Sequence, residues 1–340
     1  MIQQAIQNAI SGNHLSSVAA EEVMTEIMSG GATPAQVGAF LTALRLKGET
    51  EDEVAGFVRA MRRKATPVRC GHPLLLDTCG TGGDGAHTFN ISTTAAFVVA
   101  AAGVPVAKHG NVSVSSKCGS ADLLREAGAN LELTPEQIGR CLDQVGIAFL
   151  FAPRLHSAMR FVAAPRREIG IRTVFNILGP LTNPANPQVQ VIGVYSAQVG
   201  ELVARTLCQL EIQRAFVVYG AGGLDELSLA GPNTVWDVRS GTVSRATIDP
   251  ADLGLEYVPV EALIGGSPEE NLVITRRVLD GGRGVPRNAV ALNAALALVA
   301  SETAGNLAEG YRLSLDVLNS GAAQRKFESF IDFTRKQADA

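Results

Sequence analysis

The sequence predicts an α/β protein in which a small all-helical N-terminal domain precedes a larger domain with a mostly parallel central sheet flanked by helices. Three observations predict this class. Strand patterns are missing before about residue 73, helical apolar stripes mark the first part of the chain, and short apolar runs then alternate with helix-length segments. Strands separated by helices form parallel βαβ units with both faces of the sheet covered.

The N-terminal part carries two well-marked helices. In the first, Thr33 is the N-cap, Pro34 takes the first helical position and Gly48 marks the stop. The second opens with a capping box of Thr50 and Glu53. The apolar stripe of the first helix fits either the core of this domain or a twofold partner, and it consists of Val37, Phe40, Leu41 and Leu44.

Beyond this point the chain alternates between strands and helices. Apolar runs predict strands at 74–78, 104–109, 148–152, 189–195 and 215–221. Capping boxes predict helices after Thr134 and Ser267, and the part from about residue 286 returns to helices. We therefore expect a helical domain over 1–70, with a return excursion around 163–186, and an α/β domain over 73–160 and 187–340.

Composition narrows the functional classes. The 340 residues include 46% hydrophobic and 18% charged residues, and the net charge is −4, so no basic field favours nucleic acid as a partner. The five cysteines are scattered and odd in number, which indicates reduced thiols and a cytoplasmic protein. The apolar stretch 289–300 is too short to span a membrane, and the N-terminus does not resemble a signal peptide.

A glycine-rich loop, GTGGDG at 80–85, follows the first strand. It matches the GxGxxG pattern of dinucleotide sites, and the basic end of the next strand leaves an NADP site open as an alternative. The more general interpretation is an anion site, because glycines let peptide N–H groups approach a phosphate closely. Asn90, Ser92 and Thr93 then open a helix, whose N-terminus also favours phosphate.

Two further loops are expected at the same edge of the sheet. The stretch 108–120 gathers lysines, hydroxyls and amides after the second strand. Asp225 and Glu226 follow the fifth predicted strand, and adjacent carboxylates there suit Mg²⁺. Parallel strands deliver their following loops to one edge, so the three loops predict a site for a Mg²⁺-bound, polyphosphorylated substrate.

Four separated motifs, in order and spacing, resemble the anthranilate phosphoribosyltransferase family over nearly the whole chain. They are GTGGDG…FNIST, KHGN…SS…GSAD, GIRTVFNILGPLTNP and GLDE. The resemblance implies transfer of the phosphoribosyl group from phosphoribosyl pyrophosphate (PRPP) to the amine of anthranilate, in tryptophan biosynthesis. It also implies two Mg²⁺ ions and a homodimer formed through the helical domain.

The resemblance also implies residue roles. PRPP would be held by Gly80, Gly83, Asp84, Thr88, Asn90, Ile91, Ser92, Thr93, Lys108, His109, Gly110, Asn111, Val112, Ser113, Val114, Ser115, Ser116 and Ser120. Anthranilate would be held by Gly80, Asn111, His156 and Arg166, and the metal by Ser92, Asp225 and Glu226. Val112 stands where many members carry Arg, so a phosphate contact there would come from the backbone.

The expected mechanism needs no covalent nucleophile, because the sugar passes through an oxocarbenium-like state, and His109 is the candidate orienting residue. Three alternatives stay open at this point. They are a pyrimidine nucleoside phosphorylase of the same architecture, an NADP-dependent oxidoreductase, and a non-catalytic member that binds nucleic acid or a protein partner.

Overall fold

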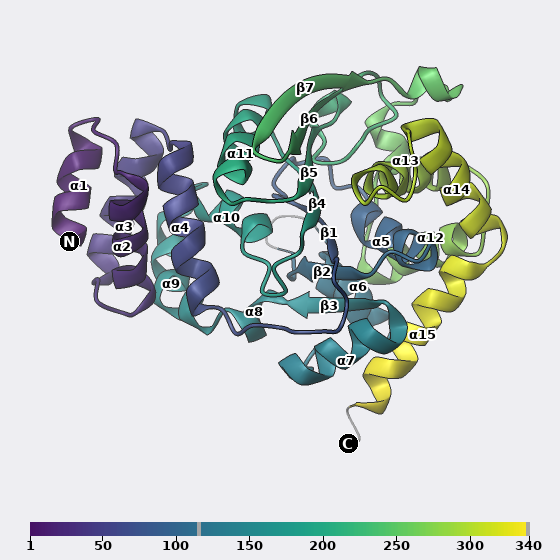
Figure 1. Cartoon of the computed structure of the whole chain (residues 1–340), viewed down its shortest axis with the longest axis horizontal. Helices are drawn as coiled ribbons and strands as arrows, with labels where there is room; N and C mark the ends of the chain where they lie inside the picture. The colour runs from purple at the N-terminus through teal and green to yellow at the C-terminus, as the bar shows by residue number, and fades with distance from the viewer. Residues whose placement is uncertain (114–116, 338–340) are drawn as a thin grey trace.

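The computed structural model describes residues 1–113 and 117–337. A seven-stranded sheet in the order β3-β2-β1-β4-β5-β6-β7 forms the centre of the molecule. Figure 1 shows α1–α4 and α9 gathered at one side of the molecule and α5 with α12–α15 on the opposite face of the sheet. The predicted class, a helical N-terminal part followed by a mostly parallel α/β part, is confirmed.

The N-terminal part consists of α1 (Ile2–Ile10), α2 (Ser17–Met28), α3 (Pro34–Lys47) and α4 (Glu51–Lys64). Both predicted N-caps are present, and each of Thr33 and Thr50 forms a reciprocal capping box. The stripe of Val37, Phe40 and Leu44 is almost fully buried in the core of the chain itself. A partner therefore cannot contact that stripe, and the exposed apolar side chain of α3 is Leu46, two residues beyond Leu44 on the other side of the helix.

The five predicted strands all form and pair in parallel. They are β1 (Leu76–Gly80), β2 (Val106–Gly110), β3 (Ile147–Phe151), β4 (Val189–Gly193) and β5 (Arg214–Tyr219). The helices between them include α5 (Ile91–Ala101), α6 (Ser120–Glu126), α7 (Pro135–Val145) and α11 (Ala197–Gln209). This βα alternation delivers the loops after β1, β2 and β5 to one edge of the sheet.

Two further strands, β6 (Asn233–Arg239) and β7 (Thr242–Ile248), form an antiparallel hairpin that the sequence did not predict. Most of β7 is exposed, so its residues lack the apolar run that marks a buried strand. The turn between them uses left-handed backbone at Ser240 and Gly241, with φ of 47° and 77°.

The segment around 160–187 folds into helices. After α8 (Ala152–Leu155), α9 (Arg160–Ile169) packs against α2 and α3, and α10 (Phe175–Leu181) packs against α4 and α11. The C-terminal part contains α12 (Pro268–Leu279), α13 (Val285–Ala300), α14 (Leu307–Asn319) and α15 (Ala322–Lys336).

Two hydrophobic cores lie on either side of the sheet. One joins β1–β3 to α5, α13 and α15, and the other joins the N-terminal helices to α10, α11 and the opposite side of β4 and β5. The five cysteines all lie in the described part, and no disulfide joins any two of them. Across residues 1–113 and 117–337, none of the helices has the length and apolar character needed to cross a membrane.

Candidate active site

The glycine loop after β1 and the acidic turn after β5 are in direct contact. The N–H of Gly82 donates to Oδ2 of Asp225 over 2.7 Å, and the N–H of Asp225 faces Oδ2 of Asp84 over 3.4 Å. A Cβ at Gly80 would lie 2.3 Å from Oδ2 of Asp225. Position 80 therefore requires glycine, because a side chain there would collide with Asp225. The glycine loop and the acidic turn form one unit.

Helix α5 brings a second peptide N–H to the same turn. Asn90 is the N-cap residue, and the N–H of Ser92 in the first turn of α5 donates to Oε1 of Glu226 over 3.1 Å. The N–H groups of Gly82 and Ser92 thus both bind carboxylate oxygens. Two elements that the sequence predicted as anion sites bind anionic oxygens in the structure.

Negative charge is concentrated at this point. Burial and the nearby carboxylate of Asp84 raise the pKa of Asp225, and burial together with Asp225 raises the pKa of Glu226. Lys108 acts in the opposite direction on the pKa of Glu226. A cation bound here would relieve the repulsion between these carboxylates.

The oxygen donors of Ser92, Asp225 and Glu226 suit a hard cation that also keeps phosphate or water ligands. Ser92, Asp225 and Glu226 line a cavity of about 10 Å³, which is the space of roughly one water molecule. Within the described residues, no three His, Cys, Asp or Glu side chains form a metal-binding cluster. Mg²⁺ suits such a place, because it is bound by one or two carboxylates together with substrate phosphates and waters.

A buried amide fixes the acidic turn from below. Oδ1 of Asn293 on α13 accepts the N–H of Leu227, and its Nδ2 donates to the Leu227 carbonyl, each over 2.9 Å. The sequence analysis did not select Asn293. Its signal was a polar residue inside the apolar stretch 289–300, where an amide is expected to have buried partners.

The end of β2 agrees with the predicted strand 104–109, whose last two residues are Lys108 and His109. Both lie within β2 and are buried, although they were also counted with the polar stretch 108–120. The Lys108 ammonium donates to the Thr78 carbonyl of β1. Parallel pairing with β3 continues to Gly110, one residue beyond the predicted end.

The loop after β2 folds back on the start of α6. The N–H groups of Ser113 and Gly119 donate to Oδ2 of Asp122 over 3.0 and 2.9 Å, and the hydroxyl of Ser120 donates to the Asn111 carbonyl over 3.2 Å. Three residues expected to bind PRPP, Val114, Ser115 and Ser116, lie outside the described residues.

Two buried imidazoles lie beside each other at the end of β2. The ring centroids of His109 and His156 are 5.1 Å apart, and Nδ1 of His109 is 3.2 Å from the Gly179 carbonyl of α10. Burial lowers the pKa of His109 to about 3 and that of His156 to about 4. Both rings are therefore neutral near pH 7, and their Nε2 atoms have no hydrogen-bond partner among the described residues.

Two arginines of the segment 160–187 stack on aromatic rings, and one of them contacts the glycine loop. The Arg166 guanidinium stacks over Phe175, with 5.1 Å to the ring centroid, and burial lowers its pKa. Arg172 donates to the Gly83 carbonyl and stacks over Tyr195 at 4.6 Å. The sequence analysis selected Arg166 and missed Arg172, although Arg172 lies inside the quoted GIRT motif.

The structure thus brings Gly80, Asp84, Ser92, Asp225 and Glu226 together directly. The stretch just after the glycine loop is held from another side, because Thr88 forms an isolated β-bridge with Ile264. The ring of His156 lies beside that of His109 at the end of β2. Arg166 lies on α9, outside the loops that follow β1, β2 and β5.

Comparison with known families agrees with this geometry. Residues 72–324 match the model described as "Glycosyl transferase family, a/b domain", and residues 3–65 match "Glycosyl transferase family, helical bundle domain". The two matches define the class: a glycosyl transferase with a helical bundle followed by an α/β domain.

Individual relatives are more specific. The chain is 60% identical to anthranilate phosphoribosyltransferase of Desulforudis audaxviator, over 99% of this chain and 97% of that one. The crystal structure of the enzyme of this name from Thermus thermophilus matches with a TM-score of 0.92 and 45% identity, over 97% and 99% of the two chains. That from Saccharomyces cerevisiae, in complex with PRPP and Mg, matches with a TM-score of 0.91 and 29% identity over 98% of each. The chain belongs to the anthranilate phosphoribosyltransferase family.

Proposed function

We propose that this protein transfers the phosphoribosyl group of PRPP to the amine of anthranilate, giving N-(5-phosphoribosyl)anthranilate and pyrophosphate. The observation that carries the proposal is the pair of peptide N–H groups, of Gly82 and Ser92, that come from two elements and bind oxyanions at one place. Family membership supports the activity, and we expect a diphosphate to bind at the N–H groups of Gly82 and Ser92.

In the reaction the anthranilate amine attacks C1 of the ribose, the bond from C1 to the pyrophosphate oxygen breaks with its electron pair leaving on pyrophosphate, and the nitrogen gives up one proton to water or to the departing pyrophosphate. Peptide N–H groups at the glycine loop and at the start of α5 stabilise the charge that develops on the leaving group. The amine is already a nucleophile, so the chain has mainly to orient it and to exclude water.

We propose the following residues for PRPP: Gly80, Gly83, Asp84, Thr88, Asn90, Ile91, Ser92, Thr93, Lys108, His109, Gly110, Asn111, Val112, Ser113, Val114, Ser115, Ser116 and Ser120. The peptide groups of the glycine loop supply donors, and Asp84, held by its neighbours, is placed for the ribose hydroxyls or a cation. Lys108 would contribute positive charge from below the phosphate-binding loops, because its ammonium is buried against the Thr78 carbonyl.

We propose that Asp225, Glu226 and Ser92 hold Mg²⁺, and that two ions take part. When bound, Mg²⁺ neutralises the charge of the diphosphate and of the departing pyrophosphate. The phosphates would replace carboxylate oxygens at the N–H groups of Gly82 and Ser92, and the freed carboxylates would then be available to the metal.

For anthranilate we propose Gly80, Asn111, His156 and Arg166, with His109 as the orienting residue. A planar guanidinium suits the anthranilate carboxylate, and neutral imidazoles suit an aromatic amine that must not be protonated before it attacks. In the structure the Arg166 guanidinium stacks over Phe175, the first residue of α10.

The test is a fluorescence assay of anthranilate consumption with PRPP and Mg²⁺. We expect the anthranilate signal to fall only when both PRPP and Mg²⁺ are present. Release of free base from thymidine or uridine with phosphate, without consumption of anthranilate, would contradict the proposal and favour a nucleoside phosphorylase.

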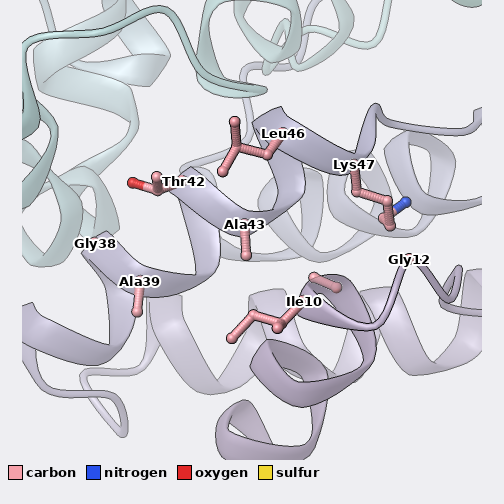
Figure 2. A pocket seen from close by; sticks show the side chains of 9 residues that line it. Ile10, Gly12, Gly38, Ala39, Thr42, Ala43, Leu46 and Lys47 are labelled. Atoms are coloured by element: carbon pink, nitrogen blue, oxygen red, sulfur yellow. The ribbon is translucent and has the colours of Figure 1, made fainter.

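We also propose a homodimer formed through the helical part. A hollow of about 560 Å³ lies between α1 and α3, and Figure 2 shows Ala43 of α3 pointing toward Ile10 of α1 across it. Ile10 and Leu46 beside this hollow are 67% and 84% exposed. Large exposed apolar side chains around a hollow favour a second copy of the chain as the occupant.

Leu46→Glu should convert the dimer to a monomer in sedimentation velocity, because a charge would be buried without a partner. Val18→Glu is the matched control, since Val18 on α2 is 66% exposed and does not line the hollow. An unchanged sedimentation coefficient for Leu46→Glu would place the interface elsewhere.

Two further proposals concern organisation and location. We propose the domain division 1–70 against 73–160 and 187–340, with the excursion 163–186 belonging to the helical side, and the packing of α9 on α2 and α3 supports it. We propose a cytoplasmic location, supported by five cysteines that form no disulfide with one another.

A further inference from the structure

Strands β1 and β2 separate just before they deliver their substrate-binding loops. Each of the other parallel pairs is in register over five residues, whereas β1 and β2 share only the pair Leu76 and Val106. The register predicts which bonds would come next if the ladder continued. The N–H of His109 would donate to the Thr78 carbonyl, and the N–H of Thr78 would donate to the Ala107 carbonyl.

Side chains take the place of these ladder bonds. The N–H of His109 donates to Oδ1 of Asp77 over 3.1 Å, and the Thr78 carbonyl accepts from the Lys108 ammonium. The Ala107 carbonyl accepts from Nδ2 of Asn183 over 2.8 Å, and the same Nδ2 donates to Oδ2 of Asp77 over 2.9 Å. The Asp77–Asn183 pair therefore lies between the two strands and satisfies the main-chain groups of β2, while Lys108 satisfies the Thr78 carbonyl of β1.

This pair is fully enclosed and connects three segments. Asp77 is 0% exposed and Asn183 is 1% exposed, and Asn183 belongs to the segment that follows α10. Oδ1 of Asn183 accepts the N–H of Ala185 over 2.9 Å, which fixes its amide so that Nδ2 faces β1 and β2. A carboxylate at this depth is costly unless its oxygens have donors, and both oxygens of Asp77 have one.

We infer that Asp77 is a positioning residue: with Asn183 it holds β1 and β2 apart so that the glycine loop and the end of β2 face each other at the width the substrates need, and it aims His109. This inference rests on the proposed function only for its kinetic readout. Asp77 does not itself reach the glycine loop, and its effect passes through the main chain of His109 and through Asn183.

Asp77→Asn tests the inference, because the amide places a donor where a carboxylate oxygen accepts. We expect kcat/KM for anthranilate to fall about 10- to 100-fold, since small displacements of positioned groups cost rates of this order. Hydrogen exchange followed by mass spectrometry should also show faster exchange in peptides covering 104–112, because the amide has one accepting oxygen for the two donors, the His109 N–H and Nδ2 of Asn183, that Asp77 accepts.

Gln190→Met is the matched control. Gln190 on β4 is the register neighbour of Asp77 on the other side of β1, is 0% exposed, and donates from Nε2 to the Pro180 carbonyl over 2.9 Å. It holds α10 to the sheet, and its bond to Pro180 does not involve β2. We expect this variant to lose thermal stability while keeping kcat/KM within about twofold of the wild type and leaving exchange over 104–112 unchanged.

Asn183→Ala provides a second variant with the Asp77 charge retained. If the pair acts as one unit, Asp77→Asn and Asn183→Ala should each produce the loss, and the double variant should lose little more than either alone. The inference is overturned if Asp77→Asn lowers the melting temperature as Gln190→Met does but leaves both kcat/KM and exchange unchanged. A wild-type protein without turnover would instead contradict the proposed function, and the exchange comparison would still decide the role of Asp77.

Discussion

His109 and His156 show how burial fixes the state of single residues in the site. Their rings are 5.1 Å apart, and burial lowers their pKa values to about 3 and about 4. The two side chains come from β2 and from the segment after α8, so no short sequence pattern could pair them. Sequence reasoning selected both through the family resemblance, and the structure adds that both are neutral near pH 7.

The lowered pKa of His156 predicts acid sensitivity. Between pH about 6.5 and about 4 the unfolded chain binds a proton at this imidazole that the folded chain does not, so stability is fully present above this window and falls with the pH inside it. His156→Gln should make the free energy of unfolding, measured by urea denaturation, less steep in pH by up to about 1.4 kcal/mol per unit. The exposed His87, changed to Gln, is the control, and an equal slope in all three proteins would contradict the assignment.

Arg166 carries the second prediction at this scale. Arg166→Ala should raise the KM for anthranilate about 10- to 100-fold, because a charged hydrogen bond to the carboxylate is lost, and should leave the KM for PRPP nearly unchanged. Arg167→Ala, on the next and exposed position of α9, is the matched control. Steady-state kinetics with each substrate varied separately decides the matter, and a change only in the KM for PRPP would show that Arg166 serves the other substrate.

At the scale of elements, the glycine loop works through its backbone. Gly82 has a φ of 63°, and its N–H binds Asp225, while nothing lies within 4 Å of the position a Cβ would take. Gly82→Ala therefore adds conformational strain without a clash. We expect a loss of roughly 1 kcal/mol in stability and a clearly raised KM for PRPP, because the N–H would no longer be held in line.

Gly241→Ala gives the comparison for this loop. Gly241, in the turn between β6 and β7, has a φ of 77° and equally open surroundings, so its stability loss should be similar. Urea denaturation and kinetics on both variants separate strain from binding. A Gly82→Ala enzyme with the wild-type KM for PRPP would show that this N–H does not contribute to the site.

Features of the fold and the site could be predicted from the sequence mainly where neighbouring residues determine them. The capping boxes at Thr50, Thr134 and Ser267 are all present, because each is decided by residues three apart. The convergence of the loops after β1 and β5 also followed, since parallel topology requires it. The Asp77–Asn183 contact joins residues 106 apart and could not be read from either neighbourhood.

At the scale of the whole molecule, the helical part is not isolated from the sheet. One core runs from α2–α4 through α10 and α11 to one side of β4 and β5, so the two parts share buried apolar contacts. Inside the helical part, Glu53, which is 0% exposed, forms an ion pair with Lys47 over 2.8 Å. Residues 65–75 and the segment 160–187 connect the helical part to the sheet, and the second carries both Arg166 and Arg172.

The central claim is that the acidic turn and the two peptide N–H groups together bind a metal-neutralised diphosphate. Isothermal titration calorimetry of PRPP binding, with and without Mg²⁺, tests it on the wild type and on the double variant Asp225→Asn with Glu226→Gln. We predict that Mg²⁺ strengthens PRPP binding to the wild type at least about tenfold, or 1.4 kcal/mol, and that this gain is lost in the double variant. An equal gain from Mg²⁺ in both proteins would contradict the account.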